Sequence, residues 1–377
     1  MLDCSLKMIT FEGSDNFVWR LVLATLSGKP IKITKIRPEE KNPGLVDYEV
    51  TFLRVLDSIT NGSVLEISYT GTTVIYKPGL IIGGVYKFTC PLSKPVGYFI
   101  EPLLALLPFA KLKSELTFEG ITSALFDTDA SATAKSQHEM SVDFIRTSIF
   151  PVLAKFGIPE VELQINKRGS APQGGGEAVL RVNTLLLAPK TLHATEQISV
   201  NKIRGVAYST RVAPTSVNRM IDICREELKP LGVDTFIYSD VAKGPESGLS
   251  PGFGVCLVAE TKKQMPVSVE ATATSGSVPE ELGKEAAHKL INEISQRGAM
   301  GGRTLPLVIV FMLLGSEDIG RLLVNKRQIS PVMVQLLKDI AAVYPGQHAA
   351  FKPEDDNGNM MMLMKGSGFV NANKKIS

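Results

Sequence analysis

Helix-like and strand-like segments recur in one order three times along this chain, and that recurrence limits the folds it can adopt. In the first copy, an apolar helix from Phe17 to Thr25 precedes an alternating strand at 30–36. A second helix, opened by Asn42-Pro43-Gly44, and two strands at 63–69 and 73–77 complete the unit. We therefore predict an α/β (α+β) fold with three repeated units of two helices on a four-stranded sheet, at about 1–94, 95–186 and 275–377.

The third copy has the strongest helical patterns. Helices are predicted at 280–295, 305–314 and 332–343, with a strand at 322–325 between the last two. The segment 305–314 is the most apolar run of the chain, but a helix of about ten residues is too short to cross a bilayer. The sequence therefore predicts a core helix here and no membrane protein.

The segment 187–274 does not follow the repeated order of helices and strands, and it is predicted to be an inserted α/β domain. Its clearest element is a helix over 217–228, capped by Pro214-Thr215-Ser216 and apolar on one face. Cys224 lies on that face and is expected to be a core residue. The strands expected to cover the helix lie near 203–209, 235–240 and 254–259.

The composition is that of an ordinary globular protein, with 44% hydrophobic and 21% charged residues among 377. The net charge of +3 gives no chain-wide electrostatic case for nucleic-acid binding, although a local basic surface stays possible. The cysteines show no metal-ligand spacing, and the first residues do not resemble a signal peptide, so we expect reduced thiols in a cytosolic or nuclear compartment. They are Cys4, Cys90, Cys224 and Cys256.

A loop at 167–177 contains two cations followed by Gly174-Gly175-Gly176, and alternating strands flank it. Consecutive glycines let backbone N–H groups converge without obstruction by Cβ atoms, so this loop can hold a phosphate or an RNA backbone. A glycine-rich hairpin turn with a solvated basic edge explains the same residues. Both interpretations remain open from the local sequence.

Common catalytic motifs are absent. The chain contains no GxxxxGK[ST], GxGxxG or HExxH pattern, so nucleotide-loop and zinc-protease functions lack support. His288 falls within a predicted helix, where a structural role is expected, and His138 falls in a polar stretch predicted to be a loop. Nothing forms a Ser/His/Asp or Cys/His constellation.

A series of landmarks, spread over residues 8–370, resembles the RNA 3′-terminal phosphate cyclase family. The resemblance implies three repeated units plus a small inserted α/β domain, in agreement with the pattern described above. The landmarks, in order, are Phe11-Glu12-Gly13, Leu26-Ser27-Gly28-Lys29-Pro30, Asn42-Pro43-Gly44-Leu45, Lys77-Pro78-Gly79, Gly83-Gly84, Gly174-Gly175-Gly176, Arg204-Gly205 and Ser250-Pro251-Gly252-Phe253-Gly254.

The departures from the family pattern fall on its nucleotide site. The cyclases carry an adenylate on a histidine just before an apolar helix, and here Gly302 stands at that place. Glycine cannot form a phosphoramidate, so cyclase activity is predicted to be absent. Acidic or aromatic side chains replace expected polar and basic ones near the triphosphate, which indicates a degenerate nucleotide site. Its residues are Glu12 (retained), Asp15, Asp47, Tyr48, Tyr98 and Gly302, with Glu49 beside them.

This combination resembles the eukaryotic, nucleolar cyclase-like branch of the family. The resemblance implies a non-catalytic factor of the small-subunit processome that binds a large ribosome-assembly GTPase and pre-rRNA. Such a factor is needed for early pre-rRNA cleavages toward 18S rRNA. We expect a nucleolar protein without cofactor or metal, monomeric by itself.

If the old cleft still holds an RNA phosphate, its candidate donors are Arg20, Lys41, Lys167 and Arg168 with the glycine loop, although each cation can equally be a solvated surface charge. An endoribonuclease acting on the 18S 5′ side of pre-rRNA is the alternative, because a carboxylate and basic groups suffice for RNA cleavage. It would recruit Glu317-Asp318 with Arg321, or Lys338-Asp339. A surviving cyclase or ligase would need Lys41 or Lys167 to accept AMP.

Overall fold

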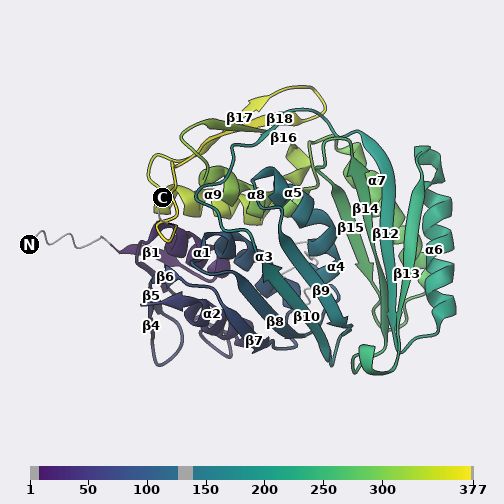
Figure 1. Cartoon of the computed structure of the whole chain (residues 1–377), viewed down its shortest axis with the longest axis horizontal. Coiled ribbons are helices and arrows are strands. Elements are labelled where there is room, and N and C mark those ends of the chain that lie inside the picture. Colours follow the sequence, from purple (N-terminus) through teal and green to yellow (C-terminus); the bar gives the residue numbers. More distant parts are fainter. Residues whose placement is uncertain (1–7, 126–138, 375–377) are drawn as a thin grey trace, which may run out of the picture.

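The computed structural model describes residues 8–125 and 139–374, and the predicted fold class is confirmed there (Figure 1). Three units each place helices on a four-stranded sheet. In every one of these sheets the first two strands are parallel and the remaining neighbours are antiparallel. The repeated order read from the sequence therefore corresponds to a repeated architecture.

The first unit contains the sheet β1-β2-β5-β4. Its elements are β1 (Ile9–Glu12), α1 (Phe17–Ser27), β2 (Ile31–Thr34), α2 (Asp47–Ile59), β4 (Val64–Ile67) and β5 (Val74–Lys77). A small ribbon of β3 (Thr60–Asn61) and β6 (Leu80–Ile81) follows α2. The predicted helix start at Asn42-Pro43-Gly44 was wrong. Gly44 has φ +91°, and a Cβ there would lie 2.3 Å from the Thr70 carbonyl oxygen, so this segment is a tight loop and α2 begins later.

The second unit contains the sheet β7-β8-β10-β9, with the glycine loop between its last two strands. Its strands are β7 (Val85–Thr89), β8 (Ser114–Gly120), β9 (Val161–Lys167) and β10 (Gly176–Val182). Its helices are α3 (Val96–Leu106), and α4 (Val142–Phe144) continuing through a π-helical turn at Ile145–Ile149 into α5 (Phe150–Lys155).

The third unit contains the sheet β11-β16-β18-β17. Its elements are β11 (His193–Ala194), α8 (Leu305–Leu313), β16 (Ile319–Asn325), α9 (Pro331–Val343), β17 (Ala349–Pro353) and β18 (Asn359–Lys365). All residues of α8 except Pro306 are buried, which agrees with its prediction as a core helix. α8 contacts both α3 and α9, and α1 contacts the same two helices, so helices form the interior and the sheets lie outside (Figure 1). Within the described residues, no helix combines the length and the apolar content needed to span a membrane.

The inserted unit differs from its predicted extent of 187–274. β11 pairs with β16 and so belongs to the third sheet, although it precedes the insertion. The helix predicted for the third copy, α7 (Pro279–Ser295), packs with α6 on the inserted sheet, where Leu282, Ala286 and Leu290 join the core of that unit. We therefore place the inserted unit at 200–295. Its other elements are β12 (Val200–Thr210), α6 (Pro214–Leu228), β13 (Thr235–Ala242), β14 (Gly252–Thr261) and β15 (Val267–Thr272), in the order β13-β12-β14-β15.

Candidate functional site

A cleft of about 700 Å³ opens where the three units meet the inserted unit. The first turns of five helices contribute to its wall, through Phe17 of α1, Tyr48 of α2, Tyr98 of α3, Pro306 of α8 and Val332 of α9. Helix N-termini carry partial positive charge, so this arrangement by itself would favour an anionic group.

Carboxylates of the cleft offset much of the positive charge of these helix N-termini. They also form ion pairs with the cationic side chains of the cleft. The Lys94 ammonium also lies over two rings, 5.1 Å from the centroid of Tyr48 and 5.8 Å from that of Tyr98. A polyphosphate would have to compete with carboxylates that already hold these cations. The pairs are Arg37 with Glu49, Lys94 Nζ with Glu139 Oε1 at 2.8 Å, and Arg303 Nη1 with Glu270 Oε1 at 2.7 Å.

Glu270 joins three parts of the molecule at this cleft. It lies on β15 of the inserted unit and is 4% exposed. Its carboxylate accepts a hydrogen bond from the backbone N–H of Ser141, which caps α4, and pairs with Arg303 at the start of the third unit's helices. This role could not be predicted from the sequence, because Glu270, Ser141 and Arg303 lie far apart along the chain.

Glu101 of α3 is a cleft carboxyl with an unusual pKa. Burial, and then the nearby charge of Glu139, raise the pKa of Glu101 to about 8. At neutral pH it is therefore mostly protonated, which makes it a hydrogen-bond donor and not a charge.

This pKa predicts a pH-dependent stability. Between pH 4.5 and about 8 the folded protein keeps a proton that the unfolded chain releases, so the free energy of unfolding falls as pH rises through this window. The slope from one group is at most about 1.4 kcal/mol per pH unit. We expect Glu101→Gln to reduce this slope in urea unfolding near pH 5, 7 and 9. Glu281→Gln, on the exposed face of α7, is the control, and equal slopes in both variants would contradict the assignment.

The degenerate nucleotide site predicted from the resemblance is partly assembled. Asp15, Tyr48, Tyr98 and Gly302 all line the cleft, and the Tyr48 and Tyr98 rings meet edge to face at 5.3 Å. The two other residues of the predicted site, Glu12 and Asp47, do not line the cleft. Glu12 pairs with Lys35 at 3.0 Å, and Asp47 accepts hydrogen bonds from Ser93 Oγ and the Tyr48 N–H.

Among the described residues no histidine lines the cleft. At Gly302, a Cβ would lie 3.3 Å from the Gln328 side chain, so that glutamine lies beside the position where the resemblance places the histidine of the cyclases. His288 is exposed on α7, and its Nε2 lies 2.9 Å from the Glu227 carboxylate. His138 and Cys4 lie outside the described residues.

Two of the four predicted RNA-contacting cations are buried in ion pairs, which corrects their proposed role. Arg20 is 3% exposed, its Nε is 3.2 Å from Asp339, and its Nη1 donates to the Gly13 carbonyl oxygen at 2.8 Å. Burial raises the pKa of Asp339, and Arg20 opposes that effect. An arginine satisfied in this way has no guanidinium face to offer a phosphate.

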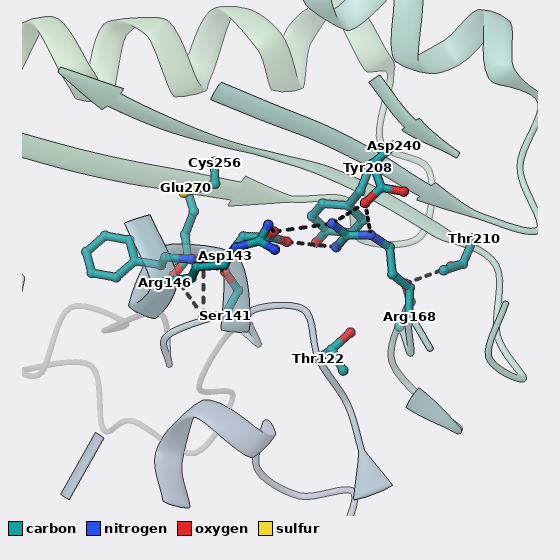
Figure 2. A network of polar contacts seen from close by, with 12 residues as sticks. Thr122, Ser141, Asp143, Arg146, Arg168, Tyr208, Thr210, Asp240, Cys256 and Glu270 are labelled. Carbon is teal, nitrogen blue, oxygen red and sulfur yellow. Dashed lines mark hydrogen bonds and ion pairs between the residues drawn. The ribbon is translucent and has the colours of Figure 1, made fainter. Parts of the chain in front are cut away.

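Arg168 is held more tightly, between the second unit and the inserted unit. Figure 2 shows its guanidinium between Asp143 and Asp240, with Tyr208 against it. Nη1 lies 2.7 Å from Asp143, Nη2 lies 2.7 Å from Asp240, and the guanidinium carbon is 4.8 Å from the Tyr208 centroid. Burial alone would raise the pKa of Asp143, but Arg168 and Arg146 hold it below its usual range. Arg168 therefore joins two units and is 3% exposed.

The other two cations stay accessible but do not converge. Lys41 is exposed in the loop before α2, and Lys167 is half-buried at the end of β9, beside Glu119. None of the four predicted cations lines the cleft. The cations that do so were missed: Arg37, Lys94, Lys289, Arg303 and Arg327. Only Arg303 could have been predicted from the sequence as a cation of the cleft, because it directly follows Gly302.

The glycine loop serves as a docking segment for the inserted unit. The Gly174 carbonyl oxygen accepts from the Leu249 N–H at 2.9 Å, and the Gly174 N–H donates to Ser170. The Arg168 carbonyl oxygen accepts from the Gly248 N–H at 2.6 Å. Gly174 and Gly176 are buried, and a Cβ on Gly175 would lie 2.7 Å from Leu249. The glycines permit this close approach of two backbones, which explains them without a bound phosphate.

The described residues contain no group of three or more His, Cys, Asp or Glu side chains arranged to hold a metal ion. The carboxylates considered for a nuclease are also dispersed. Glu317 pairs with Lys365 on the surface, whereas Asp339 is buried in an ion pair with Arg20. Cys90, Cys224 and Cys256 are buried free thiols, which confirms Cys224 as a core residue.

A family model for RNA 3'-terminal phosphate cyclase matches residues 9–347. The chain belongs to this family. Among its relatives, the rRNA processing protein RCL1 of Saccharomyces cerevisiae is 50% identical over 374 residues, covering 98% of each chain. The rRNA processing protein rcl1 of Schizosaccharomyces pombe is 42% identical, covering 97% of this chain and 98% of its own. The RNA 3'-terminal phosphate cyclase-like protein of Homo sapiens is 36% identical, covering 98% of each chain.

Proposed function

We propose that this chain acts in rRNA processing as a non-catalytic assembly factor of the small-subunit processome. It is needed for early pre-rRNA cleavages toward 18S rRNA. It works in the nucleolus, is monomeric by itself, requires no cofactor, and binds a large ribosome-assembly GTPase and pre-rRNA. The names of the two yeast relatives support the role in rRNA processing.

The observation that carries the non-catalytic assignment is Gly302. This residue lines the cleft at the position where the family resemblance places the adenylate-bearing histidine, and it has no side chain to form the covalent bond. The ion pairs of Glu49, Glu139 and Glu270 further reduce the capacity of the cleft to take a polyphosphate. The chain thus retains the architecture of the family but lacks the residue that would form the covalent adenylate.

A denaturing gel tests this function directly. Purified protein is incubated with end-labelled pre-rRNA spanning the 18S 5′ flank, with and without magnesium and ATP, under conditions where binding is first demonstrated. We expect intact RNA, because Glu49, Glu139 and Glu270 of the cleft are held in ion pairs and the described residues provide no metal cluster. In parallel, radiolabelled ATP is expected to leave no AMP on the protein.

Two results would overturn this proposal. A discrete, protein-dependent cut that disappears on a single carboxylate substitution would make the endoribonuclease alternative primary. Covalent AMP on the protein would restore a cyclase or ligase function, and mapping of the adenylated residue would test Lys41 and Lys167. Absence of RNA binding would leave the GTPase as the partner to examine by co-purification.

A further inference from the structure

The inserted unit contains a strand–helix–strand crossover that does not contribute to the main cleft. β12 and β13 are parallel neighbours, and α6 connects them. In such units ligands bind outside the carboxyl ends of the parallel strands, next to the N-terminus of the crossover helix. α6 has 15 residues, begins at Pro214, and has no side-chain cap hydrogen bond at its start.

A pocket of about 330 Å³ lies at that place. Its lining includes Arg211 directly after β12, Pro214 at the start of α6, and Val241 to Lys243 at the end of β13. One water molecule takes roughly 30 Å³ in the liquid, so the pocket is large enough for a phosphate and part of a sugar.

Two cations stand at the pocket, one from each strand end. Arg211 and Lys243 are exposed, and neither has an ion pair among the described residues. The Nε of Arg211 donates to the Gly248 carbonyl oxygen at 2.6 Å, which fixes its position and leaves the terminal nitrogens for a ligand. The acidic neighbours are Glu246, which is exposed and does not line the pocket, and Asp240, which is paired with Arg168.

A buried hydroxyl supplies an independent indication of a ligand. Ser247 lines the pocket, is 5% exposed, and its Oγ has no hydrogen-bond partner. Leaving such a group unsatisfied destabilises the folded protein. A phosphate oxygen in the pocket would accept the hydrogen of this hydroxyl and pair with both cations.

We propose that this pocket binds a backbone phosphate of single-stranded RNA. The inference rests on the proposed function and adds a site to it, away from the old nucleotide cleft. Val212 and Val241 give the pocket an apolar side that suits a ribose. Phe236 and Tyr238, on the strand leading into the pocket, are 48% and 59% exposed, and strand alternation places both on one face. Exposed aromatic rings of this kind stack with unpaired bases, which favours RNA over a phosphorylated peptide.

Fluorescence anisotropy with the full chain and a labelled single-stranded RNA of about twelve nucleotides tests the site. We expect Arg211→Ala with Lys243→Ala to weaken binding about tenfold at low salt. The slope of log affinity against log salt should fall by about 0.7, because the pocket holds one backbone phosphate and each phosphate contact on a single strand accounts for about 0.7. Ser247→Ala is expected to weaken binding less and to leave the salt slope unchanged, since it removes no charge.

The matched control removes two cations from the opposite end of the same unit. Lys229 follows the C-terminus of α6, and Lys262 follows β14 near the beginning of β12; both are exposed. Lys229→Ala with Lys262→Ala should keep the affinity and salt slope of the unmodified protein. Urea unfolding of each variant establishes that it is folded, and Lys243→Ala alone replaces the double variant if loss of the Arg211 hydrogen bond unfolds it.

The outcomes separate this inference from the proposed function. If the unmodified protein binds RNA and the pocket variants bind equally well, the pocket assignment is wrong while RNA binding stands. If the unmodified protein binds no RNA, both the pocket and the RNA part of the proposed function fail. If a phosphoserine peptide binds the unmodified protein but not the pocket variants, and RNA affinity is unchanged, the site takes a phosphoprotein instead.

Discussion

Arg168→Ala is expected to lower the free energy of unfolding by about 3–5 kcal/mol. The substitution leaves Asp143 buried, at 1% exposure, with Arg146 as its remaining partner. It also removes the ion pair with Asp240, which is one of the contacts between the inserted unit and the second unit. Urea unfolding measures the loss. Arg168→Lys should lower the free energy of unfolding less than Arg168→Ala, because lysine keeps the positive charge. A lysine still lacks the planar guanidinium that bonds both carboxylates, so some stability should be lost.

The adjacent cation provides the control. Lys167 is half-buried at the strand end, with no buried carboxylate depending on it, so Lys167→Ala should change stability by no more than about 0.5 kcal/mol. If Arg168→Ala were as stable as the unmodified protein but had lost RNA affinity, the original prediction of a phosphate donor would be correct. A combined Lys167 and Arg168 variant cannot make this distinction, because an unfolded protein also loses binding.

Gly97→Ala is expected to destabilise the protein by about 2 kcal/mol or more, although alanine is the better helix former. In α3, the exchange would gain up to about 1 kcal/mol of helix propensity. However, the new Cβ would lie 1.9 Å from the Met140 carbonyl oxygen, a backbone atom that cannot move alone. The required shift would displace Ser141, which caps α4 and donates to Glu270 at the cleft.

The reverse exchange at an exposed helical position calibrates this result. Ala154 is exposed in α5, so Ala154→Gly should cost only the propensity difference of about 1 kcal/mol. Chemical denaturation measures the free energy of unfolding of both variants. Gly97→Ala reports the steric clash, and Ala154→Gly reports the difference in helix propensity. A Gly97→Ala variant more stable than the unmodified protein would show that the helix and the Met140 segment separate easily.

Much of the fold could be predicted because its determinants are local. The apolar periodicity of α8, α9 and α6 specifies helices wherever they pack. The same periodicity in α7 indicates a buried face through Leu282 and Leu290, but it does not say which sheet covers that face. β11 has two residues, which is too short for any alternation to be visible. The limits of the inserted unit were therefore misplaced at both ends.

The site was predictable where it depended on family landmarks and not where it depended on distant partners. Asp15, Tyr48, Tyr98 and Gly302 do meet in the cleft. Arg20 was misassigned because its carboxylate partner is 319 residues away. A basic residue looks the same in sequence whether its partner is a phosphate or a buried aspartate, and only the fold distinguishes the two.

The position of β11 has a consequence for the order in which the chain folds. β11 is made before the inserted unit, yet its partner β16 comes after it, and His193 lies opposite Arg321. Closing so long a loop in a disordered chain is entropically costly and slow. The Ile198 N–H donates to the Gly298 carbonyl oxygen at 3.0 Å, so a folded insertion holds its two ends side by side. An insertion that folds first would thus shorten the connection from β11 to β16 from about 125 residues to about 25, and the third sheet would be assembled last.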